Sequence, residues 1–327
     1  MAFMGNYDVI CIGDAKIDAF LVFSDENGGG KCRLDENTNE LCFKHGEKIP
    51  VDKTFFSVGG NAANLAIGIS RLGLKSTIAA EIGDDEFSLK ILNTFANENV
   101  DRGFLKQDHE RESSFSVAIT YKEDRTLFSE HIDRPHEFNY EHADTKWVYL
   151  TSLGNEWTNA YQKAINYSLE NQAQLAFNPG TLQLREKSTV IENALQATSV
   201  LFVNKEEAKQ LIYGYSNEYG SDDIQQILSN VKALGPKTVI LTDGENGSFA
   251  LDNDNNYFQQ DHAPSTIVEL TGAGDAFSTG FLAARIYGLG LQEAMQWGNL
   301  NAASVIEQMG AQKGLLRKKE MEEKFNG

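Results

Sequence analysis

Cysteine is scarce in this chain of 327 residues, and positive charge is in short supply. The three cysteines, Cys11, Cys32 and Cys42, lack the spacing of metal ligands, and their odd number argues against a disulfide framework. Lys and Arg total 29 against 47 Asp and Glu, which gives a formal net charge of −18. Such acidity argues against nucleic acid or an anionic membrane surface as a partner.

Long apolar runs are missing as well. Nowhere does the chain reach the roughly 18 consecutive apolar residues of a membrane-spanning helix, and no basic region followed by an apolar run opens it. These absences predict a cytoplasmic protein. Neither a Walker A sequence nor a Gly-x-Gly-x-x-Gly motif occurs, which excludes P-loop kinases and dinucleotide-binding oxidoreductases.

Short apolar runs alternate with helical patterns along most of the chain. We expect strands at 7–12, 77–81, 147–150, 174–177, 200–203 and 238–241. We expect helices at 60–73, 86–98, 156–170, 187–196, 205–212 and 221–234, and a helical pattern from 272 almost to the end. This alternation predicts βαβ units and therefore an α/β fold with a mostly parallel sheet. Residues 1–327 are expected to form one domain, since α/β folds often reach this length.

Two segments, at about 18–57 and 113–132, interrupt the alternation. They contain strand-like runs at 19–23, 41–44, 54–58, 115–121 and 126–132. The polar residues 122–125 join the last two runs as a hairpin-like turn. We therefore expect antiparallel strands outside the main sheet, inserted into the domain.

The stretch Gly-Ala-Gly-Asp at 272–275 stands at the expected start of a helix. A helix N-terminus offers unpaired N–H groups and attracts anions, and the small residues Gly272, Ala273 and Gly274 allow a phosphate to approach the backbone. Asp275 then places a carboxylate beside the anion. An anion cradle with an adjacent base is what phosphoryl transfer to a hydroxyl requires. The alternative is a tight turn followed by an ordinary first-turn aspartate.

A second motif lies at 59–73, where Gly59 and Gly60 lead into an Ala-rich helix. Gly and Ala are suited to close packing of a helix on a sheet, and packing is the simpler explanation of the small residues. It does not explain Asn64 in the first turns, whose amide is able to donate to and accept from a polyol.

Together these segments resemble the ribokinase-like (PfkB) family of carbohydrate and nucleoside kinases. The family motif Asp-Thr-Thr-Gly-Ala-Gly-Asp corresponds to 269–275, and its Gly-Gly pair with an Ala/Asn-rich helix corresponds to 59–73. Further matches, in order along the chain, lie at 13–18, 82–85, 204–207 and 242–247. The resemblance implies a three-layer α/β/α fold, dependence on ATP and Mg²⁺, and a small β lid over the sugar site that is often used for dimerisation.

The resemblance also implies roles for the residues around the acceptor. Asp275 is the expected general base, and the N–H groups of residues 272–274 are expected to stabilise the transferred phosphoryl group. Asp18 and Asn64 are the expected ligands of substrate hydroxyls, with the backbone of Gly59 and Gly60. Asp14, four residues before Asp18, is a competing candidate and otherwise a turn residue.

Other matches concern the nucleotide. Asn204 and Glu207 are expected to position Mg²⁺, and Glu207 is expected to do so through water. The alternative is that Asn-x-x-Glu is an ordinary capping box at the start of a helix. The expected nucleotide site also includes three residues of a glycine-punctuated turn before the strand-like run 248–251, namely Thr242, Gly244 and Gly247. Asn299, in a late helix, is expected on the adenine side.

The chain departs from the family motif at its first two positions, which are Glu269 and Leu270. In several relatives this segment binds an activating monovalent cation with a C-terminal loop that matches 309–311 here. Glu269 is thus a candidate ligand of K⁺. Its carboxylate extends one methylene further than an aspartate, and Leu270 removes a hydroxyl.

These matches predict an ATP-dependent kinase that phosphorylates a hydroxymethyl group of a small sugar or sugar acid. A nucleoside kinase acting on the 5′-hydroxyl is the alternative, because the expected lid mixes aromatic with charged residues and so fits either acceptor. A non-catalytic sensor is a further alternative, against which the intact Asp275 argues. A homodimer through the lid is expected from the resemblance.

Overall fold

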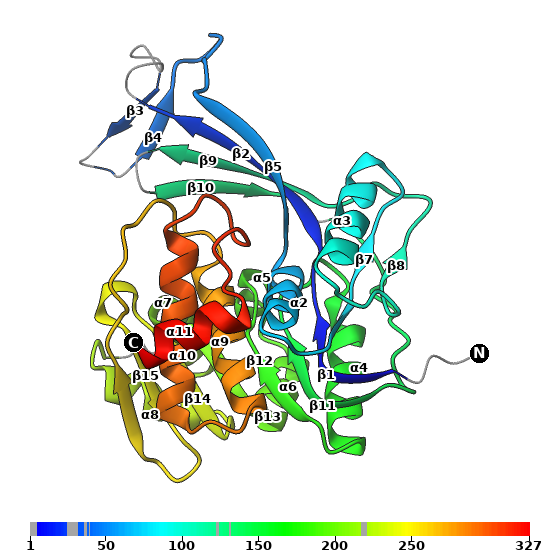
Figure 1. The fold of residues 1–327 in the computed structure, drawn as a ribbon, viewed down its shortest axis with the longest axis vertical. Coiled ribbons are helices and arrows are strands. Elements are labelled where there is room, and N and C mark those ends of the chain that lie inside the picture. Colours follow the sequence, from blue (N-terminus) through cyan, green and yellow to red (C-terminus); the bar gives the residue numbers. More distant parts are fainter. Residues whose placement is uncertain are drawn as a thin grey trace.

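The computed structural model describes residues 5–24, 32–35, 38, 40–121, 124–130, 132–216 and 221–327 (Figure 1). Its largest sheet has eight strands in the order β16 (Tyr257–Gln260), β15 (Ser248–Leu251), β14 (Thr238–Thr242), β13 (Thr198–Asn204), β12 (Gln174–Phe177), β11 (Asp144–Leu150), β1 (Asn6–Ile12) and β6 (Ser76–Ala79). Neighbours from β14 to β6 are parallel, and β14, β15 and β16 pair antiparallel. The predicted, mostly parallel α/β sheet is confirmed.

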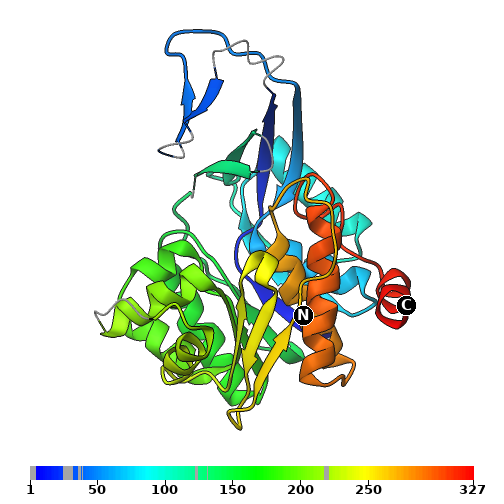
Figure 2. The same cartoon turned by 90° about the vertical axis from the view of Figure 1, so that its left-hand side faces the viewer.

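Helices cover both faces of this sheet (Figure 2). Strand β1 shows why, because its residues alternate between two cores: Val9 and Cys11 pack on one side, Ile10 and Ile12 on the other. The first side is covered by α2 (Asn61–Arg71), α9 (Ala273–Ile286) and α10 (Leu291–Ile306), and the second by α4 (Trp157–Glu170), α6 (Thr189–Ala197), α7 (Lys205–Ser216) and α8 (Ile224–Lys232). Cys11 is a fully buried core residue, as a small apolar side chain in a central strand should be.

Some elements differ from the sequence prediction. The expected strand at 77–81 is divided into β6 and the short β7 (Glu81–Ile82), which pairs with β8 (Lys106–Gln107) away from the main sheet. Helix α3 (Glu86–Asn97) agrees with the prediction, whereas α5 (Thr181–Arg185) and β16 were not expected. The helical pattern after 272 is broken between α10 and α11 (Lys318–Asn326), where Gly310 adopts a positive φ of 85°.

A second sheet of four strands projects from the helical layers, and we call it the lid sheet (Figure 1). Its order is β10 (Asp124–Ser129), β9 (Phe115–Tyr121), β2 (Lys16–Phe23) and β5 (Lys53–Gly59). The pairs β9–β10 and β2–β5 are antiparallel, but the central pair β2–β9 is parallel. The expectation of antiparallel strands is wrong for that pair, because a long crossover, and not a hairpin, connects β2 to β9.

Three expected segments near the ends of the lid sheet, at 41–44, 122–125 and 126–132, can be compared with the structure. A two-stranded hairpin of β3 (Cys32–Asp35) and β4 (Glu40–Phe43) accounts for the expected run at 41–44. Of the expected turn at 122–125, residues 122–123 lie outside the described residues, and Asp124 and Arg125 already pair within β10. The run expected to extend to 132 ends at Ser129, and residue 131 lies outside the described residues. In the described part of the chain, every helix is too short or too polar to cross a membrane.

Candidate active site

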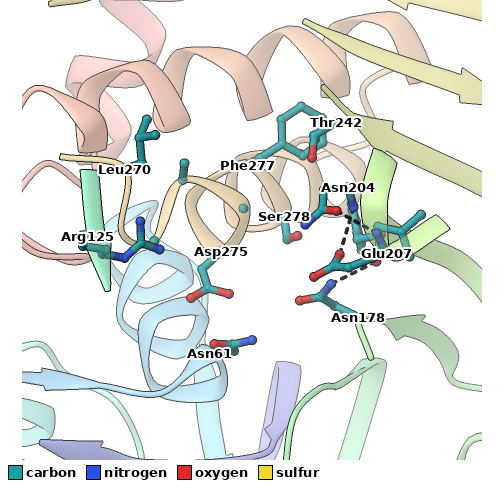
Figure 3. A pocket seen from close by; sticks show the side chains of 15 residues that line it. Asn61, Arg125, Asn178, Asn204, Glu207, Thr242, Leu270, Asp275, Phe277 and Ser278 are labelled. Carbon is teal, nitrogen blue, oxygen red and sulfur yellow. Dashed lines mark hydrogen bonds between the residues drawn. The ribbon is translucent and has the colours of Figure 1, made fainter. Parts of the chain in front are cut away.

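A pocket of about 320 Å³ opens where the parallel strands end and α9 begins (Figure 3). Asn178 follows β12, Asn204 ends β13 and Thr242 ends β14, so neighbouring strands deliver polar side chains to one edge. The carboxyl edge of a parallel sheet is where ligands of α/β proteins bind. The lining residues are Asn61, Arg125, Asn178, Phe202, Val203, Asn204, Glu207, Thr242, Leu270, Gly272, Ala273, Gly274, Asp275, Phe277 and Ser278.

The N-terminus of α9 forms one wall of this pocket. Gly272 caps the helix with a φ of 80°, and a Cβ there would lie 2.4 Å from the Cβ of Ala311, so both conformation and space require glycine. A Cβ on Gly274 would meet only open space. The first-turn N–H groups of a helix have no i−4 carbonyl to bond, which leaves this wall suited to an anion.

Asp275 lies in the first turn of α9 with only 8% of its surface exposed. Burial raises the pKa of its carboxyl to about 6, opposed by the hydrogen bond from Asn64 and reinforced by the negative charges of Glu207 and Asp18. A carboxylate with this pKa is ionised at neutral pH and is still basic enough to take a proton. Its position in the first turn of α9 puts a carboxylate in the pocket next to the unpaired N–H groups of the helix N-terminus, as expected of a base beside an anion.

Asn64 reaches Asp275 from α2. Its Nδ2 donates to Asp275 Oδ2 at 2.8 Å, and its Oδ1 accepts from Gln312 Nε2 at 2.9 Å. All three side chains are buried. These contacts make Asn64 a partner of the expected base, and its predicted role as a ligand of substrate hydroxyls stays a prediction. One N–H of its amide remains for a second acceptor.

Asp18 comes from the lid sheet and is also buried. Its Oδ1 has no hydrogen-bond partner among the described residues, and burial raises the pKa of the carboxyl. A Cβ on Gly59 would lie 1.9 Å from Asp18 Oδ2, so only glycine leaves room for this carboxylate. Gly60, with a φ of 96°, packs its Cα against the carbonyl oxygen of Asp14, where a Cβ would come within 2.3 Å.

Asn204 and Glu207 form the expected capping box at the start of α7. Asn204 N–H donates to Glu207 Oε2 at 2.9 Å, and Glu207 N–H donates to Asn204 Oδ1 at 2.8 Å. Burial raises the pKa of Glu207. Within the described residues, no three His, Cys, Asp or Glu side chains gather as a metal site. One carboxylate lining a pocket with amide groups nevertheless fits Mg²⁺, which usually retains several waters and uses one or two carboxylates.

Three predicted nucleotide-site residues lie away from the pocket lining. Gly244 and Gly247 belong to the turn between β14 and β15, where a Cβ on Gly247 would lie 2.3 Å from the carbonyl oxygen of Gln260. Asn299, in α10, donates to the carbonyl oxygen of Asp261 at 2.8 Å. Thr242, which was predicted together with these three residues, does line the pocket.

The sequence prediction missed four polar residues that line the pocket, Asn61, Arg125, Asn178 and Ser278. Asn178 directly follows an expected strand, and its Nδ2 donates to the carbonyl oxygen of Phe202 at 2.9 Å. Asn61, in the first turn of α2, donates weakly to Thr151 Oγ1 at 3.4 Å. For these two, their place at a strand end and a helix start was an available signal. No sequence signal identified Arg125, because its approach to the pocket depends on how the lid sheet folds over.

Glu269 is buried between two loops. Its Oε1 accepts from the N–H of Thr271 at 2.8 Å and from the hydroxyl of the same residue, and its Oε2 accepts from the N–H of Gly310 at 3.0 Å. Arg125 lies with its Nε 3.6 Å from Glu269 Oε1. Both carboxylate oxygens therefore already face hydrogen-bond donors.

Comparisons with known proteins place the chain among kinases. A model of the pfkB family of carbohydrate kinases matches residues 30–318. The chain is 27% identical over 255 residues to fructoselysine 6-kinase of Shigella flexneri, covering 77% of this chain and 91% of that protein. It is 24% identical over 293 residues to 5-dehydro-2-deoxygluconokinase of Bacillus licheniformis, covering 84% and 89%.

The structure is similar to that of Arabidopsis thaliana ribokinase complexed with ribose and ATP, with a TM-score of 0.78 and 16% identity, covering 99% of this chain and 100% of that one. At this identity the similarity concerns the fold, and it confirms the predicted ribokinase-like architecture. The family match spans most of the chain and its relatives are named kinases, so the expected phosphotransferase class is confirmed too. The protein is a member of the pfkB family of carbohydrate kinases.

Proposed function

We propose that this protein transfers the γ-phosphate of ATP to a hydroxymethyl group of a small sugar or sugar acid. The observation that carries the proposal is the position of Asp275, a buried carboxylate in the first turn of a helix whose Gly-Ala-Gly start lines the same pocket. The kinase relatives named for fructoselysine and for a deoxygluconate support the acceptor class.

In this mechanism Asp275 accepts the proton of the acceptor hydroxyl as its oxygen attacks the γ-phosphorus. Asn64 holds the carboxylate in place through its 2.8 Å hydrogen bond. The N–H groups of residues 272–274 face the negative charge that develops on the transferred phosphoryl oxygens. Because these dipoles are fixed before the reaction, no reorganisation is needed at the transition state.

The acceptor is held from the lid side. Among the described residues, none forms a hydrogen bond with Asp18 Oδ1. A carboxylate is able to accept hydrogen bonds from two neighbouring hydroxyls of a sugar. The backbone of Gly59 lies next to Asp18 and that of Gly60 next to Asp14, and in this proposal both contribute to binding the acceptor. The negative charge of Asp18 adds to the effect of burial in raising the pKa of Asp275.

The nucleotide binds on the opposite side of Asp275 in this proposal. Asn204, Glu207 and Thr242 line that part of the pocket, and Gly244, Gly247 and Asn299 support the turn and strand behind it. Glu207 would hold Mg²⁺ through water, and the ion would neutralise phosphate charge when bound. Residues 1–327 act as one domain in this proposal. Its lid sheet excludes water from the reacting groups. The lid sheet also pairs with the lid sheet of a second copy of the chain, which gives a homodimer.

A panel assay tests the function. Acceptor-dependent ADP release from Mg-ATP is measured with hexoses, pentoses, keto-deoxy sugar acids, glycated amines and nucleosides, for the wild type and for Asp275→Asn. We expect turnover of a sugar or sugar acid that falls by on the order of 1,000-fold in the variant while ATP binding is retained. A nucleoside as the best acceptor would favour the nucleoside kinase. ATP binding without turnover of any acceptor would contradict the proposal and favour a sensor.

A further inference from the structure

An arginine of the lid sheet forms an ion pair with the loop that precedes the anion cradle. Arg125 Nε lies 3.6 Å from Glu269 Oε1, and the Glu269 side chain is completely buried. Figure 3 shows Arg125 beside Leu270, on the side of Asp275 away from Glu207. The pair therefore joins β10 to the segment that runs directly into Gly272.

The surroundings of Glu269 do not fit a monovalent cation. The N–H groups of Thr271 and Gly310 and the hydroxyl of Thr271 point their hydrogens at its two oxygens. Leu270 brings a hydrocarbon side chain in place of the hydroxyl of the family motif. A cation bound by this carboxylate would also lie close to the fixed positive charge of Arg125, and in a buried site that repulsion is weakly screened.

The lid sheet also contacts the loop that contains Gly310, whose N–H donates to Glu269. Phe20 and Phe55 stack at 4.6 Å on the face of the lid sheet that also carries Arg125, and their register row lies two residues along each strand from that of Arg125. The Cβ position of Gly310 lies 3.7 Å from Phe55 and 3.9 Å from Phe20. Lifting the lid would separate these two rings from Gly310. It would also separate Arg125 from Glu269, and the buried Glu269 carboxylate would lose its counter-charge.

We propose that Arg125 is a positioning residue that supplies, from the lid, the positive charge that the family resemblance assigns to a monovalent cation. Lid closure brings the guanidinium to Glu269, and Glu269 in turn holds the Thr271 and Gly310 backbone that shapes the start of α9. The anion cradle is then completed only when the lid is closed, and K⁺ is not needed. This inference rests on the proposed kinase function.

The first test compares cations and variants in steady-state turnover. We expect wild-type kcat/KM to agree within about two-fold in KCl, NaCl and choline chloride at equal ionic strength, since Arg125 provides the charge. Arg125→Ala should lower kcat/KM by on the order of 10-fold to 100-fold through misplacement of the cradle. Free guanidinium should restore part of that loss. Lys53→Ala is the matched control, because Lys53 lies in the same register row of the same face and should change kcat/KM little.

The second test needs no turnover. Hydrogen exchange of residues 124–130 and 269–274 should be faster in Arg125→Ala than in the wild type or Lys53→Ala, and KCl should raise the wild-type melting temperature no more than NaCl does. Specific activation or stabilisation of the wild type by K⁺ would overturn the proposal, as would Arg125→Ala matching Lys53→Ala in exchange. Failure of the wild type to phosphorylate any acceptor would instead refute the kinase function, and the exchange data would still decide the role of Arg125.

Discussion

The amide of Asn64 donates to the carboxylate of Asp275 at 2.8 Å across 211 positions of sequence. The bond joins the start of α2 to the start of α9, and these two helices lie side by side on one face of the main sheet (Figure 1). Gln312 fixes the other end of the same amide. A side chain held at both ends is oriented before any substrate arrives, and its hydrogen bond lowers the pKa of Asp275.

The first prediction follows from this bond. Replacing Asn64 with Ala removes a hydrogen bond that favours the ionised carboxylate, so the pKa of Asp275 should rise. Such bonds contribute about 1.5–3 kcal/mol, so the acidic limb of the profile of kcat/KM against pH should move up by about one pH unit or more. In the wild type this limb is expected near the Asp275 pKa of about 6.

Asn61→Ala is the control for that profile, because Asn61 lies in the same turn of α2 but donates to Thr151. It should leave the acidic limb near its wild-type position, even if it changes the KM of a substrate. An unmoved limb in Asn64→Ala would refute the claim that Asn64 tunes the base.

A second prediction concerns stability. The pKa of Asp275 is about 6 in the folded protein against 3.8 ordinarily, so the folded state binds more protons between these values and loses stability as pH rises through them. The difference corresponds to roughly 3 kcal/mol, present in full above pH 6 and absent below the ordinary pKa. Asp275→Asn removes this cost, and its gain in the free energy of unfolding should be larger at about pH 8 than at about pH 5.

Urea unfolding at both pH values measures this gain. Asp254→Asn changes an exposed acid in the turn between β15 and β16 and should alter the free energy of unfolding little at either pH. Equal gains at both pH values for Asp275→Asn would show that the carboxyl carries no burial cost.

Gly59→Ala should act like a mutation of Asp18. The added Cβ would lie 1.9 Å from Asp18 Oδ2, so the carboxylate must turn away from the position it now holds. We expect the KM of the acceptor to rise by on the order of 10-fold to 100-fold, with the KM of ATP changed far less. Gly274→Ala provides a contrast in the same assay, because its Cβ would enter open space beside the expected phosphate and should affect ATP instead. Parallel increases in both KM values for Gly59→Ala would point to general misfolding.

Much of this arrangement was accessible from the sequence, and the reasons are local. The Gly-Ala-Gly-Asp and Gly-Gly motifs predicted both helix starts because a positive φ and close packing leave few residues other than glycine at positions such as 60 and 272. Asn178 directly follows an expected strand and could have been found from that place, whereas Arg125 was missed because its approach to the pocket depends on the position of the lid. The parallel pairing of β2 and β9 was missed for a similar reason, as sequence alternation reveals a strand but not the direction of its partner.

The last prediction concerns the outer face of the lid sheet. Phe128 and Phe56, which are 57% and 46% exposed, lie in one register row with Val117 and Ala19 across all four strands. An apolar row whose two end rings are this exposed is stabilised by burial against a similar surface, and the family resemblance makes a second copy of the lid the expected partner. Light scattering after size exclusion should therefore give a dimer for the wild type and a monomer for Phe128→Glu.

Leu169→Glu is the control for this measurement. Leu169 is more exposed than Phe128, at 64%, but lies on α4, away from the lid sheet, so the variant should remain dimeric. This comparison separates loss of a specific apolar row from the general effect of adding negative charge to an acidic protein. A monomeric wild type, or a dimer that persists in Phe128→Glu, would show that the outer face of the lid is not the interface.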